Sequence, residues 1–253
     1  MADSPKSPRS AVRLAPMEVP KASDVLAGDL RERILSGEFV EDTQLPPERD
    51  LVTQTQMSRS TVREALRILE VQGLVRIKSG RAGGAFVQRP SQNSVATSMS
   101  LLIRGRQLRL SSLLETREAI EPVCARLAAQ NRTDDELAVL DQANKALETA
   151  EGNLSDFLNA NIDWHIGVAT ASHNELLEAL MIALSKAIYT ATENEAFVDA
   201  EVRGVTARAH KSITTAIRQK NPDAAVRRMT RHVHSYAKAV LETDERVEIP
   251  VDD

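Results

Sequence analysis

Apolar side chains recur every three to four positions in three short stretches near the start of the chain, as in helices that each bury one face. The first stretch is residues 22–36, the second begins near Pro47, and the third is 58–73. Proline fits the first turn of a helix but not its interior, so Pro47 favours a helix start. Residues 74–88 then contain two β-prone runs around a Gly-rich turn, which predicts a hairpin. Three helices followed by a hairpin form a winged helix.

From about residue 111 to residue 243 the pattern predicts helices alone. Thr133 and Glu136 have the spacing of a capping box and open one of these helices. Pro222 separates the last two, because the residue before a proline disfavours helical geometry. The expected fold is therefore mainly α. It is an N-terminal winged helix-turn-helix, with three helices and a β-hairpin, joined to an all-α antiparallel bundle of six or seven helices.

Breaks in the pattern divide the chain into five segments. The start of the chain is rich in Pro and Ser and has no apolar period, which is typical of a disordered tail. The predicted segments are a tail at 1–20, a winged helix at 21–89, a linker at 90–108, a helical domain at 109–245 and a tail at 246–253.

Composition indicates the cellular compartment of the protein and shows that charge is unevenly distributed along the chain. The single cysteine, Cys124, excludes an intrachain disulfide, and no apolar run has the length of a membrane span or resembles a signal peptide. We therefore expect a cytoplasmic protein with no membrane partner. The formal net charge is −4, yet residues 49–90 carry eight Arg or Lys and only three acids. This asymmetry indicates a nucleic-acid-binding part joined to a part that does not touch nucleic acid.

The predicted third helix has the residues that a DNA-reading helix needs. In a helix-turn-helix the N-terminal end of the second helix reaches base edges in the major groove. Four residues occupy that end here: Arg59, Ser60, Thr61 and Arg63. Arg binds guanine with two hydrogen bonds, and Ser or Thr contacts a base or a phosphate. Arg49 suits a phosphate or groove contact, and Arg81 in the wing turn suits the minor groove. The alternative is that arginines only solvate a helix face, as we expect of Arg67.

The motifs LPPERDL, SRSTVREALRILEVQGLV and GRAGGAFV resemble the winged-helix domain of GntR-family transcription regulators, in order and spacing across residues 22–89. The resemblance implies a homodimer that reads a short palindrome in double-stranded DNA. It also implies DNA contacts by Arg49, Arg59, Ser60, Thr61, Arg63 and Gly80. Asp42 and Gln56 depart from the family, which often has Gly at both positions. Asp tolerates a left-handed backbone better than most residues, whereas Gln fits it poorly.

Helical geometry sorts the five histidines. Asn161 and His165 are four residues apart and share a face, whereas Asp163 points elsewhere. His210 and His232 are predicted on apolar, inward-looking faces of two later helices. Two histidines are expected at the surface: His173 and His234. Buried imidazoles need polar partners, so the other three either share a divalent metal or form three separate hydrogen bonds.

Residues 108–243 resemble the all-helical FCD effector domain of the FadR-type branch of the same family. The resemblance rests on Arg117 followed by Glu121, on the NIDWH run that ends at His165, and on two later histidines. It implies a divalent metal, with zinc the first candidate and nickel or manganese the alternatives. The implied ligands are Asn161, His165, His210 and His232. The acyl-CoA-responsive members lack this histidine set, so the chain looks unlike them.

The ligand set favours an anionic effector. Three neutral imidazoles and the amide oxygen of Asn161 leave the charge of the ion uncompensated, which weakens ion binding and strengthens attraction for an anion. A small organic acid would bind the metal on one side and Arg117 on the other. The alternative is that Arg117 pairs with Glu121 on its own helix.

These observations predict a DNA-binding transcription regulator, expected to be a repressor, whose operator affinity depends on a small carboxylate effector. A metalloregulator that senses the ion itself stays open as an alternative. A metal-dependent enzyme is the third hypothesis. We expect no enzyme, because the sequence has no HExxH motif or nucleophile elbow and the DNA-reading half would be unexplained.

Overall fold

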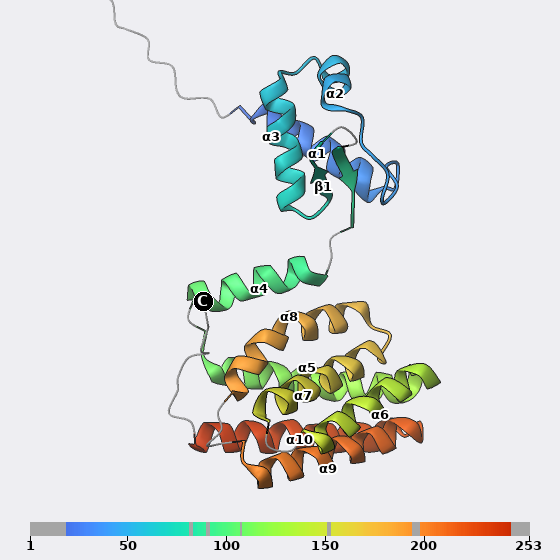
Figure 1. The fold of residues 1–253 in the computed structure, drawn as a ribbon, viewed down its shortest axis with the longest axis vertical. Helices are drawn as coiled ribbons and strands as arrows, with labels where there is room; N and C mark the ends of the chain where they lie inside the picture. The colour runs from blue at the N-terminus through green and yellow to red at the C-terminus, as the bar shows by residue number, and fades with distance from the viewer. Residues whose placement is uncertain are drawn as a thin grey trace, which may run out of the picture. The chain divides into compact units, whose positions relative to one another are not determined.

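The computed structural model describes residues 19–80, 83–89, 92–106, 108–150, 153–193 and 198–243. It divides into two compact units at Pro90, and each is described by itself. The N-terminal unit contains three helices and one antiparallel hairpin (Figure 1). Its elements are α1 (Ala22–Leu35), α2 (Glu48–Thr55), α3 (Arg59–Val71), β1 (Val75–Lys78) and β2 (Gly84–Val87). The winged helix-turn-helix predicted from the sequence is thereby confirmed.

Local sequence signals set the ends of these helices. Pro47 precedes α2, and the hydroxyl of Ser58 caps α3 by accepting a hydrogen bond from the amide of Thr61 at 3.1 Å. Gly73 follows α3 with a φ of 72°, a left-handed conformation that glycine adopts without strain. The helices and the hairpin enclose one aliphatic core, which includes Leu30, Val62, Leu66 and Leu69.

The hairpin is tied to the loop before α2. Val75 pairs with Val87 in the register of β1 and β2. On the other side of β2, the amide of Leu45 donates to the carbonyl of Ala85 at 2.8 Å, and the amide of Val87 donates to the carbonyl of Thr43 at 2.8 Å. Residues 42–45 therefore run along β2 as an additional extended segment.

Two residues stand where the resembled family often has glycine, and both adopt left-handed backbone. Asp42 has a φ of 63° and Gln56 a φ of 57°. Gln56 lies between α2 and α3, and its side-chain amide donates to the carbonyl of Thr53 at 2.7 Å. The turn before α3 thus keeps the backbone that glycine would favour, with a side chain that adds one local hydrogen bond.

The second unit is all-helical, as predicted, and it is the bundle drawn from green to red in Figure 1. Its helices are α4 (Gln92–Arg106), α5 (Leu110–Asn131), α6 (Asp134–Thr149), α7 (Leu154–Thr170), α8 (Glu175–Thr192), α9 (Ala200–Arg218) and α10 (Pro222–Thr243). The expected capping box forms between Thr133 and Glu136 at the start of α6. Residues 92–106, inside the segment expected as a linker, form α4, which packs on α8.

Packing between helices that are distant in sequence builds the core of this unit. α5 lies along α10, α6 lies along α7, and α9 lies beside α10 (Figure 1). Trp164 of α7 is fully buried in this core together with Ile213 and Ile217 of α9. Within the described residues, no helix has the length and apolar character needed to cross a membrane.

Candidate functional site

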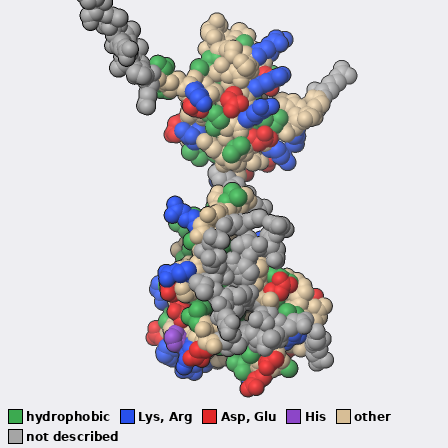
Figure 2. Space-filling view, turned by 90° about the vertical axis from the view of Figure 1, so that its left-hand side faces the viewer, with side chains coloured by type: hydrophobic (Ala, Val, Ile, Leu, Met, Phe, Trp, Pro, Cys, Tyr) green, Lys and Arg blue, Asp and Glu red, His purple; other side chains and the backbone are tan. Residues whose placement is uncertain are grey.

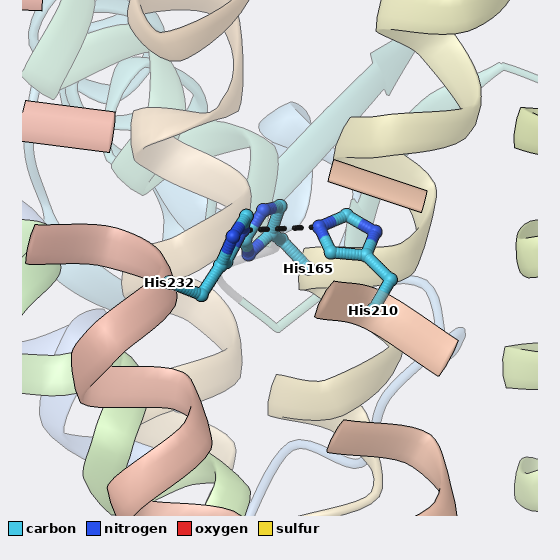
Figure 3. A group of neighbouring side chains, drawn as sticks. All are labelled: His165, His210 and His232. Atoms are coloured by element: carbon cyan, nitrogen blue, oxygen red, sulfur yellow. Dashed lines mark hydrogen bonds between the residues drawn. The ribbon is translucent and has the colours of Figure 1, made fainter. Parts of the chain in front are cut away.

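Three histidines from three helices meet inside the helical bundle. His165 comes from α7, His210 from α9 and His232 from α10, and their rings point toward one another (Figure 3). One nitrogen of each ring lies within 4.8 Å of a nitrogen of both others. His165 and His210 are buried, and His232 is partly buried.

The spacing of two of the nitrogens suits one bound ion. The Nε2 atoms of His210 and His232 are 3.1 Å apart. Two nitrogens bound tetrahedrally to zinc, each about 2.0–2.1 Å from the ion, lie about 3.3 Å from each other. The same distance also fits a hydrogen bond between the two rings, in which one Nε2 donates and the other accepts.

Arg117 and Glu121 of α5 contact the imidazole of His165. Both side chains are buried, and Arg117 Nε donates to Glu121 Oε1 at 2.6 Å. Arg117 Nη2 also donates to His165 Nε2 at 3.2 Å, which places the proton of the neutral ring on Nδ1. That Nδ1 lies 2.6 Å from Glu121 Oε2. A carboxylate beside the far nitrogen of an imidazole orients it as a metal ligand and makes it more basic.

Burial keeps all three imidazoles neutral. It lowers the pKa of His165 and, more strongly, that of His210, and the charge on Arg117 lowers both further. Burial also lowers the pKa of His232 to about 3. Burial alone would raise the pKa of Glu121, but Arg117 and His165 outweigh it and hold that pKa well below its ordinary value. Near neutral pH the cluster therefore holds neutral rings, the form that binds metals, beside one carboxylate and one guanidinium.

Asn161 completes the group that the sequence predicted. It is buried one turn before His165, and it lines the same small cavity of about 20 Å³ as Arg117, His165 and His232. Asp163 is exposed on the other side of α7, as predicted. The two histidines expected at the surface are both exposed: His173 and His234.

Trp164 orients the imidazole of His210. Its ring stacks on that of His210, with centroids 3.7 Å apart and planes inclined by 12°. Trp164 Nε1 donates to Thr214 Oγ1 at 3.0 Å, and Asn144 Nδ2 donates to the same oxygen at 2.9 Å. Among the described residues, His210 Nδ1 has no hydrogen-bond partner, so the stack and the His232 contact set its orientation.

The candidate DNA-reading residues gather at the start of α3. Arg59 and Ser60 are exposed there, and the hydroxyls of Ser60 and Thr61 lie 2.9 and 2.8 Å from that of Ser58. Arg63 pairs with Glu48 of α2, with Nε 2.8 Å from Oε2. The two helices of the helix-turn-helix are thus joined by an exposed ion pair beside the expected DNA contacts.

The other predicted contacts flank this end. Arg49 lies in the first turn of α2, next to Asp50. Gly80 follows β1 with a φ of 102°, while Arg81 lies outside the described residues. Figure 2 shows Lys and Arg side chains side by side along one edge of the N-terminal unit, with Asp and Glu among them.

Comparisons with known proteins assign both units. Residues 22–87 match the model of bacterial regulatory proteins of the gntR family, and residues 112–235 match the FCD domain. The HTH-type transcriptional repressor NanR of Salmonella typhi is 31% identical over 242 residues, which cover 92% of this chain and 89% of that protein. The solved structure of Streptococcus agalactiae GntR covers 86% of this chain and 99% of its own, at 27% identity and a TM-score of 0.66. The chain belongs to the GntR family. Its FCD domain places it in the FadR-type branch, among transcription regulators rather than enzymes.

Two contacts of this GntR-family chain join different helices and are not predicted by the sequence pattern. The spacing of Arg117 and Glu121 indicates their ion pair, but not that Glu121 also meets His165 from another helix. The stack of Trp164 on His210 likewise joins helices α7 and α9. Its one signal in the sequence is that the sole tryptophan directly precedes His165.

Proposed function

We propose that this chain is a transcriptional repressor that binds a palindromic operator as a homodimer and responds to a small organic acid bound at a divalent metal. The observation that carries the proposal is the convergence of three neutral imidazoles from three helices, two of them buried and one partly buried, beside a buried arginine. The repressor assignment follows the NanR relatives, which are named as transcriptional repressors.

The residues present fit a metal ion. His210 and His232 would supply nitrogens, and Asn161 would supply an amide oxygen. His165 would supply Nε2 once the ion replaces the hydrogen bond from Arg117. Asn161, His165 and His232 line a cavity of about 20 Å³, which is the size of one water molecule or ion, and His210 contacts His232 beside it. Zinc suits imidazole ligands, and nickel and manganese are the alternatives. The ion would act as a Lewis acid that attracts a carboxylate.

Arg117 would hold the effector against the ion. Its guanidinium lies beside His165 and is held by Glu121, so its direction is set by the protein. A carboxylate that bridges the ion and Arg117 would offset two positive centres that otherwise face each other. Effector binding would then change how residues 90–108 orient the two DNA-binding units, so that the half-site spacing no longer matches.

Zinc titration tests the metal site directly. Trp164 is the only tryptophan and stacks on His210, so its fluorescence reports the cluster in the full-length chain. We expect His232→Ala to weaken zinc binding at least about 100-fold and His234→Ala, two residues away and exposed, to leave it unchanged. Equal zinc affinity in both variants would refute the site.

Asn161→Asp separates the effector from the ion. The added negative charge should tighten zinc binding and weaken acetate binding to the zinc-loaded chain. Operator binding to a duplex selected from random DNA, measured with zinc and with or without organic acids, tests the response. Release by zinc alone would favour the metalloregulator alternative.

A further inference from the structure

A groove of about 380 Å³ lies between α9 and α10, directly beside the histidine cluster. The α10 side of the groove presents one helical face: Arg228, Arg231, His232, Ser235, Tyr236 and Ala239. The α9 side includes Ser212 and Thr206. The lining of the whole groove therefore mixes charged groups, hydroxyls and aliphatic surface, as in sites that bind small polar molecules.

The groove continues into the cavity at the cluster. Four residues line both spaces: Val202, Thr206, His232 and Tyr236. The inner cavity is about 20 Å³, room for about one water molecule. The proposed ion would fill it, so an acid that binds the ion must extend into the groove.

Charge gives the groove a direction. Arg228 donates to the backbone carbonyl of Ser212, and His232 contacts His210, so α9 and α10 run antiparallel along it. Arg228 therefore lies toward one end, one turn before His232, and Arg231 directly precedes His232. Asp199 and Glu201, at the start of α9, line the opposite end. An anionic group that extends from the cluster is attracted toward the arginines and repelled from the acids.

We propose that the effector carries two anionic groups. One lies at the histidine cluster beside Arg117, and the other lies in the groove against Arg228 and Arg231. Arg228 precedes His232 by four residues, so the two residues are about 6 Å apart along the axis of α10, which sets the scale of the spacing between the two groups. This inference rests on the proposed metal-bound carboxylate and adds a second subsite, which selects dicarboxylates over simple monocarboxylates.

A series of acids of increasing length tests the second subsite. Binding of acetate, succinate and adipate to the zinc-loaded full-length chain would be measured by calorimetry and by Trp164 fluorescence. We expect adipate to bind at least about tenfold more tightly than acetate. Arg231→Ala, at an exposed position, should remove most of that advantage without changing acetate binding. Arg228→Ala should do the same, although its bond to Ser212 also supports the fold.

Arg227→Ala is the matched control. Arg227 is exposed on the same helix and does not line the groove, so its removal changes the net charge equally. Equal affinity of the parent chain for acetate, succinate and adipate would overturn the second subsite. So would tighter binding of adipate than of acetate that survives in the double variant Arg228→Ala/Arg231→Ala. Failure of zinc or of all three acids to bind would instead refute the proposed function. Zinc and acetate binding with no gain for adipate would refute only the present inference.

Discussion

Replacing Glu121 with glutamine should strongly destabilise the helical unit. The carboxylate lies 2.6 Å from both Arg117 Nε and His165 Nδ1, and the Arg117 and Glu121 side chains are 5% and 2% exposed. Glutamine keeps the shape but leaves the guanidinium as an uncompensated buried charge. Breaking a buried pair in this way costs about 3–5 kcal/mol, and the retained amide oxygen places Glu121→Gln near about 3 kcal/mol.

Urea unfolding followed by Trp164 fluorescence measures this cost in the unit concerned, because the only tryptophan is buried there. With a slope of about 1–3 kcal/mol per M urea, the midpoint should fall by about 1–3 M. Glu118→Gln is the control, since Glu118 pairs with His234 at an exposed site on the same helix. Exposed pairs contribute about 0–1 kcal/mol, so equal midpoints for the two variants would refute the reasoning. The double variant Arg117→Met/Glu121→Met should recover much of the loss, because no charge is then left unpaired.

Three further predictions concern acid stability, DNA contact and backbone strain. As the pH falls below about 6.5, the three histidines become protonated in the unfolded chain, whereas they stay neutral in the folded chain. Because their folded pKa values are lowered, the free energy of unfolding should drop by up to about 1.4 kcal/mol per pH unit for each histidine, down to a pKa of about 3 for His232. Urea midpoints in chelator that are equal from about pH 7 to about pH 5 would contradict this. Arg59→Ala should cost about 1–3 kcal/mol of operator binding, and Arg67→Ala less than about 0.5 kcal/mol, in a binding assay at fixed salt. Gln56→Gly should be more stable than Gln56→Val by about 1–2 kcal/mol, measured by hydrogen exchange in α2 and α3, because a β-branched residue disfavours left-handed backbone.

Signals within a few residues predicted much of this fold. The capping box at Thr133, the cap at Ser58 and the proline before α2 all appear where expected, since each acts through local backbone geometry. Residues 92–106 were expected as a linker that turns apolar. They form α4, a helix whose apolar positions include Met99 and Ile103 and which is supported by packing on α8.

The candidate site was predictable to the level of helix faces. The spacing of Asn161 and His165 placed both inward and Asp163 outward, as the structure shows. Spacing within one helix does not indicate which helices pack against each other. The contact of Glu121 with His165 and the stack of Trp164 on His210 arise only from the packing of α5, α7 and α9.

The backbone link between residues 42–45 and β2 has a consequence for how a binding site in DNA can vary. Leu45 and Thr43 hydrogen-bond to the wing strand only a few residues before α2 begins. The wing should therefore shift together with α2, and because α3 packs on both α2 and β1, the wing and α3 should keep a fixed separation on the duplex. A base change that narrows or widens one groove would then disturb both contacts at once, so tolerated operator changes should occur as correlated pairs of positions within each half-site.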